Sequence, residues 1–317
     1  MKECVMPLVS VNDYPVRPVL KVLLQDKTTK KNIIFAENEY SQHGPDFSET
    51  NEITAEKLTY MHLMPRVEKE LEHQQARTRT KAEVFTPSWV CNKMNNHCDE
   101  EWFGRPGVFN TEMENGWETN PNTIDFGDLS WKDYVDSRRI EITCGEAPYI
   151  ASRYDTTTGD IIPLTDRIGI LDRKFRVVNE NASDDKEWLK WTERAFQSVY
   201  GYEYQGDNLL IARINLLNTY VDYYRARLEC DPDVKTLRKI ANIIAWNLWQ
   251  MDGITGTIPF GKAEEDFVQA EGEWMAEILN SNEAEEMVEH DQSDTETPVC
   301  RIFDWRSNES IKFTDIK

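Results

Sequence analysis

The residues best suited to chemistry in this 317-residue chain are carboxylates that end short β-prone runs. The first is Glu141, in the run at residues 139–142, and it is followed by a tight turn and then by helix-compatible sequence. In a Rossmann-like sheet, such a turn presents backbone amides to a nucleotide-type ligand at the carboxyl end of the first strand. The turn is not Gly-x-Gly-x-x-Gly, so a dinucleotide is not the favoured ligand. Its residues are Thr143, Cys144, Gly145, Glu146 and Ala147.

Further acids follow other β-prone runs. Residues 199–204 are predicted to form a strand that ends near Glu203, and Asp207 is predicted to cap the helix behind it. Residues 243–254 are another apolar-biased run, in which Asp252 precedes a glycine. Residues 167–172 read as a rival strand that ends in Asp172. The helix after Glu203 is predicted from apolar residues that recur on one face, namely Leu210, Ile214, Leu217 and Val221.

A further segment lies upstream, where Phe85, Thr86 and Pro87 are predicted to open a helix. The Thr86 hydroxyl is suited to capping that helix. Pro87 is suited to the first helical position, because no N–H is needed there.

Taken together, these segments resemble the DNA adenine-N6 methyltransferases, in particular the modification subunits of restriction–modification systems. The family's cofactor loop runs acid-Pro-small-Cys-Gly/Ala-x-Gly/Ala. In this chain Ile142 replaces the common Pro, and Ala147 replaces a common Gly. Alanine is the mildest departure from glycine where a backbone must approach a ligand.

The resemblance implies S-adenosyl-L-methionine as cofactor and assigns a role to each segment. Phe85, Thr86, Pro87 and Glu141 would lie beside the methionine moiety, and residues 143–147 would form the loop. Glu203 would accept hydrogen bonds from the ribose hydroxyls, with Asp172 as the alternative, and Glu203 is preferred because the helix after it matches the family better. Asp252 would accept from the adenine amino group.

The family's base-holding tetrapeptide, Asn/Asp-Pro-Pro-Tyr/Phe, does not occur in the sequence. Asn120-Pro121 lacks the second proline and the aromatic residue. Residues 300–306 are similar to a segment that precedes the catalytic strand in longer relatives, so the chain is expected to end before that strand. DNA contact, catalysis and target recognition would then need a second methyltransferase or restriction subunit. The alternative is a non-catalytic protein that senses S-adenosylmethionine or scaffolds a restriction complex, so enzymatic activity stays open.

Composition limits the other functional classes. The net charge of -21 argues against a bare DNA-binding module, because phosphate contacts need clustered Lys and Arg. A mean hydropathy of -0.64 and the lack of a long apolar run predict no transmembrane span. The first residues form no apolar signal core, so a cytoplasmic protein is expected.

Cysteine usage predicts neither a metal site nor a thiol nucleophile. The six cysteines have no second ligand pair at zinc-binding distance, and no metal is expected. Cys144 has no histidine nearby in sequence, so it is interpreted as a packing residue.

The predicted fold class is α/β, a Rossmann-like methyltransferase core with a mostly helical N-terminal extension. Short strands or buried segments are predicted at residues 19–24 and 31–35, a short helix at residues 55–64, a hairpin around residues 155–160, and a helix at residues 184–200 with Trp188 in the core. The predicted regions are the N-terminal region 1–76, the connector 77–135, the core 136–262, the acidic segment 263–299 and the strand-like tail 300–317.

Overall fold

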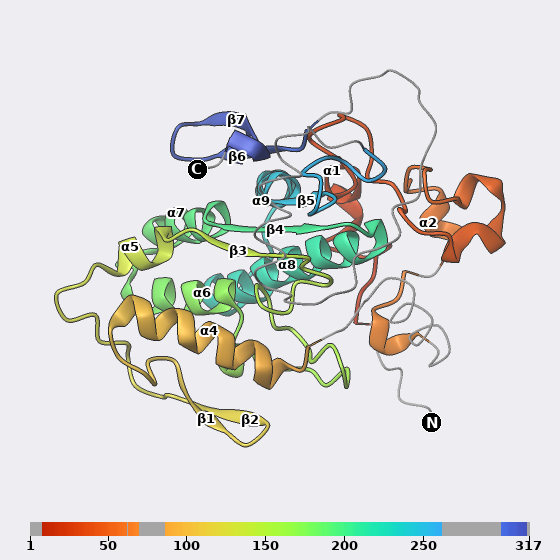
Figure 1. The fold of residues 1–317 in the computed structure, drawn as a ribbon. Helices are drawn as coiled ribbons and strands as arrows, with labels where there is room; N and C mark the ends of the chain where they lie inside the picture. The colour runs from red at the N-terminus through yellow and green to blue at the C-terminus, as the bar shows by residue number, and fades with distance from the viewer. Residues whose placement is uncertain (1–7, 62, 70–85, 262–298, 316–317) are drawn as a thin grey trace, which may run out of the picture.

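The computed structural model describes residues 8–61, 63–69, 86–261 and 299–315. A three-stranded parallel sheet lies at its centre, with the strands in the order β3–β4–β5 (Figure 1). The three strands are β3 (Arg139–Glu141), β4 (Val199–Glu203) and β5 (Leu248–Gln250). The sheet and its helices confirm a mixed α/β fold, with Glu141 and Glu203 at the strand ends where the sequence predicts them.

Strand register sets these acids on neighbouring strands, two residues apart along the register. Glu141 pairs with Gly201, and Glu203 pairs with Gln250. Every residue of β4 and β5 is buried, as expected for parallel strands that are covered on both faces. Because the strands are parallel, the turns that follow them meet at one edge of the sheet. We call this side, formed by the residues that follow β3, β4 and β5, the carboxyl edge.

Two helices connect each pair of neighbouring strands. The connection from β3 to β4 contains α6 (Ile170–Asn181) and α7 (Asp185–Gln197). The connection from β4 to β5 contains α8 (Gly206–Leu228) and α9 (Val234–Asn247). The side chains of Asp184 and Asp233 cap α7 and α9, because each accepts from a backbone N–H of the first turn.

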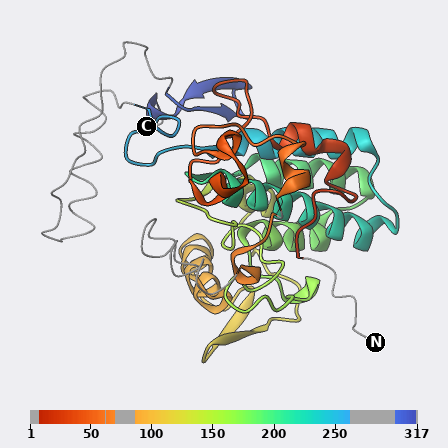
Figure 2. The same cartoon turned by 90° about the vertical axis from the view of Figure 1, so that its right-hand side faces the viewer.

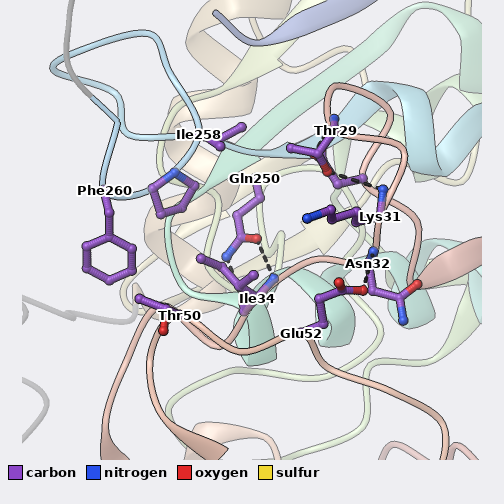
Figure 3. A pocket seen from close by; sticks show the side chains of 11 residues that line it. Thr29, Lys31, Asn32, Ile34, Thr50, Glu52, Gln250, Ile258 and Phe260 are labelled. Carbon is purple, nitrogen blue, oxygen red and sulfur yellow. Dashed lines mark hydrogen bonds between the residues drawn. The ribbon is translucent and has the colours of Figure 1, made fainter. Parts of the chain in front are cut away.

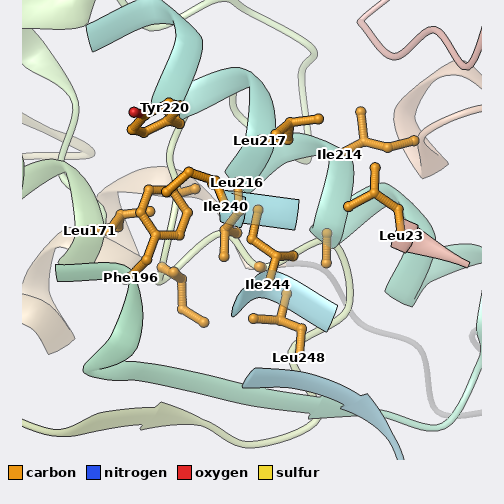
Figure 4. Packing of buried hydrophobic residues seen from close by; sticks show 14 of the residues in the cluster. Leu23, Leu171, Phe196, Ile214, Leu216, Leu217, Tyr220, Ile240, Ile244 and Leu248 are labelled. Atoms are coloured by element: carbon orange, nitrogen blue, oxygen red, sulfur yellow. The ribbon is translucent and has the colours of Figure 1, made fainter. Parts of the chain in front are cut away.

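The main hydrophobic core lies between these helices and the sheet (Figure 4). Leu217 of α8 and Ile244 of α9 are fully buried there, together with Leu248 of β5. Leu23 of the N-terminal region belongs to the same cluster, so this region shares its core with the sheet. Trp188 is fully buried in this cluster, which confirms its predicted place in the core.

The other face of the sheet carries a hairpin of β6 (Arg301–Asp304) and β7 (Glu309–Lys312). Its side chains pack with Tyr200, Tyr202 and Trp249. The predicted strand-like tail is therefore confirmed as strand, in a sheet of its own. β3 forms an edge of the central sheet, and Ile140 within it and Ile142 directly after it are 49% and 50% exposed.

The described part of the N-terminal region contains short helical turns joined by irregular chain, and it lies beside the carboxyl edge (Figures 1 and 2). Of the two alternatives predicted for residues 19–24, the buried segment is confirmed and the strand is not, because Val19 and Leu23 are buried within a 3-10 turn and α1. Residues 31–35 form only isolated bridges, and the helix expected at residues 55–64 shortens to α2. The turns are η1 (Arg17–Val19), α1 (Leu20–Leu23), η2 (Glu39–His43), η3 (Pro45–Phe47), α2 (Lys57–Tyr60) and η4 (Arg66–Glu68).

The connector carries one long helix and a small hairpin. The elements are α4 (Ser88–Phe103), β1 (Asn110–Met113), β2 (Gly116–Thr119) and α5 (Trp131–Asp136), and the 3-10 turns η5 (Leu164–Asp166) and η6 (Phe313–Asp315) occur later. A bridge between Tyr154 and Ile161 confirms the predicted hairpin turn. The predicted acidic segment, apart from Val299, lies outside the described residues.

Candidate functional site

The loop after β3 is built from alternating left-handed residues. Thr143, Gly145 and Ala147 have φ angles of 47°, 53° and 62°. L-residues other than glycine rarely adopt this conformation, so the surrounding contacts must hold it in place. The Cys144 N–H donates to the Tyr202 carbonyl at 2.8 Å, and the Ala147 N–H donates back to the Cys144 carbonyl at 2.7 Å. The loop is therefore a tight turn fastened to β4, as the sequence predicts.

The helix expected directly after this turn is absent. Residues 148–163 form turns and an isolated bridge, and the next α-helix is α6. The left-handed backbone of Ala147 is one reason for this difference, because a residue with φ near 62° lies outside a right-handed helix.

Cys144 packs inside the loop. Its side chain is 1% exposed, and a Cβ on Gly201 would lie only 3.3 Å from the Cys144 sulfur. Burial raises the pKa of the Cys144 thiol well above its ordinary value. A buried, protonated thiol is a poor nucleophile, which agrees with a packing role.

Glu203 joins the end of β4 to this loop. One carboxylate oxygen accepts from the Gly145 N–H at 2.8 Å, and the other accepts from the Gln205 N–H at 3.1 Å. The side chain is 7% exposed. The structure therefore brings Glu203 and the predicted cofactor loop into direct contact.

Asp252 lies at the same edge, in the turn after β5. Its Oδ1 accepts from the N–H groups of Ile254 at 2.8 Å and Thr255 at 3.4 Å. Its Oδ2 has no hydrogen-bond partner among the described residues. The neighbouring Met251 N–H donates to the Glu203 carbonyl at 3.1 Å, so the turns after β4 and β5 are linked.

The Glu141 carboxylate faces its own loop and is buried. It accepts from the N–H of Ile150 at 3.2 Å and from that of Tyr149 at 3.4 Å. Burial raises the pKa of Glu141 well above its ordinary value, and the nearby charge of Glu203 raises it further. Two neighbouring carboxylates at this edge therefore oppose each other's ionisation.

Glu146 connects the loop to the N-terminal region. Its carboxylate accepts from the Arg66 N–H at 2.7 Å and from the Tyr154 hydroxyl at 2.6 Å, and its side chain is 1% exposed. Asn215 of α8 donates to the Glu146 backbone carbonyl at 3.1 Å. Glu146 thus holds the loop against the N-terminal region and the residues around Tyr154.

The upstream segment differs from its prediction. Phe85 lies outside the described residues. α4 starts at Ser88, so Pro87 occupies the N-cap position, and the Thr86 side chain makes no cap hydrogen bond. The Ser88 N–H donates instead to Asp155 at 2.7 Å, so an acid far away in sequence satisfies this helix end. The predicted Thr86 cap and the predicted Pro87 helical position are therefore wrong.

Asp172, the alternative ribose acid, is not at the end of a strand. It is in the first turn of α6, so the strand predicted at residues 167–172 is wrong. Its Oδ2 accepts from the N–H and hydroxyl of Ser152 at 2.9 and 3.2 Å. Glu203 is the acid at a strand end, which agrees with the preference for Glu203.

Asp207 corrects another prediction. It lies inside the first turn of α8 rather than at its cap, because Gln205 is the N-cap residue. Its Oδ2 accepts from the Tyr40 hydroxyl at 2.9 Å and from the Lys69 ammonium at 3.0 Å. The first turn of a helix favours an acid, and here a buried cation from the N-terminal region pairs with it.

The same acid belongs to a cluster that sequence reasoning missed. Single ligand atoms of Glu37, Glu39 and Asp207 lie within 4.8 Å of one another. The Lys69 ammonium, which also lies 3.7 Å from Glu39, brings a positive charge to this cluster. Lys69 thus forms ion pairs with Glu39 and Asp207. The sequence does not predict these pairs, because the partners are far apart in the chain.

A cavity of about 270 Å³ lies next to β5, between the N-terminal region and the loop at residues 258–260 (Figure 3). Its side chains include Gln250 of β5 and Phe260. None of the residues predicted to bind a cofactor lines it.

Among the described residues, no helix is long and apolar enough to cross a lipid bilayer. Comparisons of the chain with family models, with curated proteins and with solved structures gave no match.

Proposed function

We propose that this chain is the S-adenosylmethionine-binding part of a DNA adenine-N6 methyltransferase of the restriction–modification type. Its core would be a Rossmann-like methyltransferase core, reduced to the three strands β3, β4 and β5. The catalytic strand and the target-recognition domain would come from another chain.

The observation that carries this proposal is the meeting of three separate segments at the carboxyl edge. The loop after β3, Glu203 at the end of β4 and Asp252 after β5 are each separated by 49 or more residues in sequence. The parallel order β3–β4–β5 brings them together, and the Gly145–Glu203 hydrogen bond joins two of them directly. Ligands of open α/β sheets bind at this edge.

The chemistry of these groups fits a sulfonium nucleoside. Carboxylates accept hydrogen bonds from hydroxyl and amino groups, so Glu203 would hold the ribose and Asp252 the adenine amino group. The Asp252 Oδ2, without a partner among the described residues, is an acceptor suited to that amino group. The tight turn at residues 143–147 would approach the ligand through its backbone. When bound, S-adenosylmethionine supplies an electrophilic methyl group.

Two observations favour a partner chain. The sequence has no Asn-Pro-Pro-Tyr/Phe tetrapeptide to hold a target adenine. β3 is also an edge strand, whose backbone can pair with a further strand, and it carries the exposed Ile140 with the exposed Ile142 directly after it. A strand from a partner would extend the sheet there.

The same missing tetrapeptide, with the net charge of -21, also supports the second candidate, a non-catalytic protein that senses S-adenosylmethionine or scaffolds a restriction complex. Methyl transfer to adenine in duplex DNA, measured with and without the partner subunit, distinguishes the two. Transfer only with the partner supports the split enzyme. No transfer in either case, with cofactor binding retained, supports the second candidate.

Calorimetric titration with S-adenosylmethionine at low salt tests the cofactor site. We expect the wild type to bind, and Glu203→Gln and Asp252→Asn each to weaken binding about tenfold, as expected for losing a charged hydrogen-bond acceptor. Glu118→Gln, an exposed acid on β2, is the matched control. Absence of binding by the folded wild type, or equal affinity in all three variants, would refute the proposal.

A further inference from the structure

The cavity beside β5 is formed by two segments that are far apart in sequence (Figure 3). One wall comes from the N-terminal region, and the other comes from β5 and the loop behind it. At about 270 Å³ it has the volume of roughly nine water molecules, at about 30 Å³ each. Its lining residues are Asp26, Thr29, Lys31, Asn32, Ile34, Thr50, Glu52, Gln250, Ile258, Pro259 and Phe260.

The back of the cavity is fixed in place by Gln250. Its side-chain amide accepts from the Ile34 N–H at 2.9 Å and donates to the Ile34 carbonyl, also at 2.9 Å. The same amide donates to the Tyr204 carbonyl at 2.8 Å. A cavity with such a wall is formed before any ligand arrives, which lowers the ordering cost of binding.

Two opposite charges on the lining do not pair with each other. The Lys31 ammonium reaches toward the middle of the cavity and has no hydrogen bond or ion pair among the described residues (Figure 3). Glu52 uses one carboxylate oxygen to accept from the Asn32 N–H at 3.0 Å. Its other oxygen has no partner among the described residues. The cavity therefore offers one charged donor group, Lys31, and one charged acceptor oxygen, on Glu52, to a ligand.

Phe260 lies on the side of the cavity opposite Lys31, with the Thr50 side chain on the same side (Figure 3). Pro259, Ile258 and Ile34 also contribute apolar side chains to the lining. The Phe260 side chain is 50% exposed, and its backbone is held in the left-handed region at φ 64°. An aromatic ring in this position is a surface on which a planar ligand can stack.

We propose that this cavity binds an uncharged planar heteroaromatic ring of nucleobase size. The ring packs against Phe260 and Pro259, a ring nitrogen or carbonyl accepts from Lys31, and an amino group donates to Glu52. The site shares no residue with the cofactor site proposed above and does not depend on it.

Charge and size select this class of ligand. Asp26 and Glu52 contribute two negative charges against the single positive charge of Lys31, so an added anion is disfavoured. The Asp26 carboxylate already accepts hydrogen bonds from the N–H and the hydroxyl of Thr29. Glu52 is therefore the carboxylate that would contact the ligand. The volume lies below the roughly 300–1,000 Å³ of pockets that bury drug-sized ligands, so one ring system fills it.

The probes for the test are adenosine and cytidine, which are neutral at pH 7, with adenosine monophosphate as the anionic comparison. Saturation-transfer NMR and calorimetry on the full chain are expected to give a Kd on the order of 0.1–1 mM for at least one nucleoside. Phe260→Ala, Lys31→Met and Glu52→Gln are each expected to weaken this binding roughly tenfold, through lost stacking or a lost charged hydrogen bond.

Two controls isolate the cavity. Ile254→Ala changes an exposed residue of the loop after β5 that does not line the cavity, and Lys21→Met removes an exposed lysine of α1. Both should bind like the wild type, and all variants should keep its circular dichroism spectrum and urea midpoint.

Three outcomes would overturn the proposal. The first is no binding of either nucleoside by the folded wild type. The second is tighter binding of adenosine monophosphate than of adenosine. The third is binding that is lost in Asp252→Asn but kept in Phe260→Ala and Lys31→Met, since this would place the ring at the carboxyl edge. Titration with S-adenosylmethionine tests the cofactor site by itself. The proposal for the cavity and the proposal for the cofactor site can therefore be refuted independently.

Discussion

Replacing Gly206 with alanine should loosen the N-terminal region from the sheet. Gly206 is the first residue of α8, and its N–H donates to the Phe35 carbonyl at 3.0 Å. A Cβ at this position would lie 1.9 Å from the Ile34 carbonyl oxygen and 2.9 Å from a methyl group of Ile53. Since real Cβ contacts essentially never fall below 3.0 Å, the strand-like segment at Ile34 must move by at least about 1.1 Å.

The magnitude follows from what that movement disturbs. It strains the Gly206–Phe35 hydrogen bond and the two hydrogen bonds between Ile34 and Gln250, each contributing about 1 kcal/mol net. The higher helix propensity of alanine offsets up to about 1 kcal/mol. We therefore expect Gly206→Ala to lower the free energy of unfolding by about 2–3 kcal/mol.

Equilibrium urea denaturation, followed by tryptophan fluorescence, measures this change. Gly116→Ala is the control, because an added Cβ there meets nothing within 4 Å, and surface changes usually stay within about 0.5 kcal/mol. If the two alanine variants unfold at the same urea concentration, the close approach of Ile34 to α8 is not a feature of the folded protein in solution.

Three further predictions test the buried groups. Burial raises the folded-state pKa of Glu141 above its unfolded value, so the wild type loses stability as the pH rises through that pKa. The free energy of unfolding of Glu141→Gln, relative to that of the wild type, should therefore increase from pH 5 to pH 8 in urea titrations. A difference that does not change with pH would contradict this. Leu217→Ala should lower the free energy of unfolding by about 2–5 kcal/mol in the same assay. Leu189→Ala, which shortens a side chain that is 37% exposed, should lower it much less. Equal losses in the two variants would contradict the packing of α8. Brief alkylation mapped by mass spectrometry should modify the exposed Cys98 and spare the buried Cys144 in the native state, and equal labelling would mean that the loop opens readily.

Much of the central fold can be predicted from local sequence. The runs that end at Glu141 and Glu203 are strands, and the apolar face of Leu210, Ile214 and Leu217 is buried on a helix. In the turn after β3, Gly145 adopts the left-handed conformation that glycine permits, whereas Thr143 and Ala147 are held in it by their surroundings. Each of these features depends on periodicity or turn chemistry within about twenty residues, which the sequence displays directly.

The helix ends show where local reasoning fails. Thr86 and Asp207 have the side chains of N-cap residues, but neither caps a helix. Asp155 caps α4 from a distant hairpin, and Asp207 pairs instead with Lys69 of the N-terminal region. A buried ion pair or a distant carboxylate can take the place of a local cap. The reason is that leaving a buried charge without a partner costs more free energy than losing a side-chain cap.

The sequence by itself thus determined the local pieces of the carboxyl edge: strands that end in acids, the tight turn and the helices behind them. Only the tertiary structure decided which acids follow the strands of that edge, because strand order and parallel pairing bring Glu203 and Asp252 together, whereas Asp172 belongs to α6. It also placed the N-terminal region against α8 and opened the cavity beside β5. The physical reason is that these arrangements depend on contacts between residues far apart in the chain, such as Ile34 and Gln250, and no local pattern specifies them.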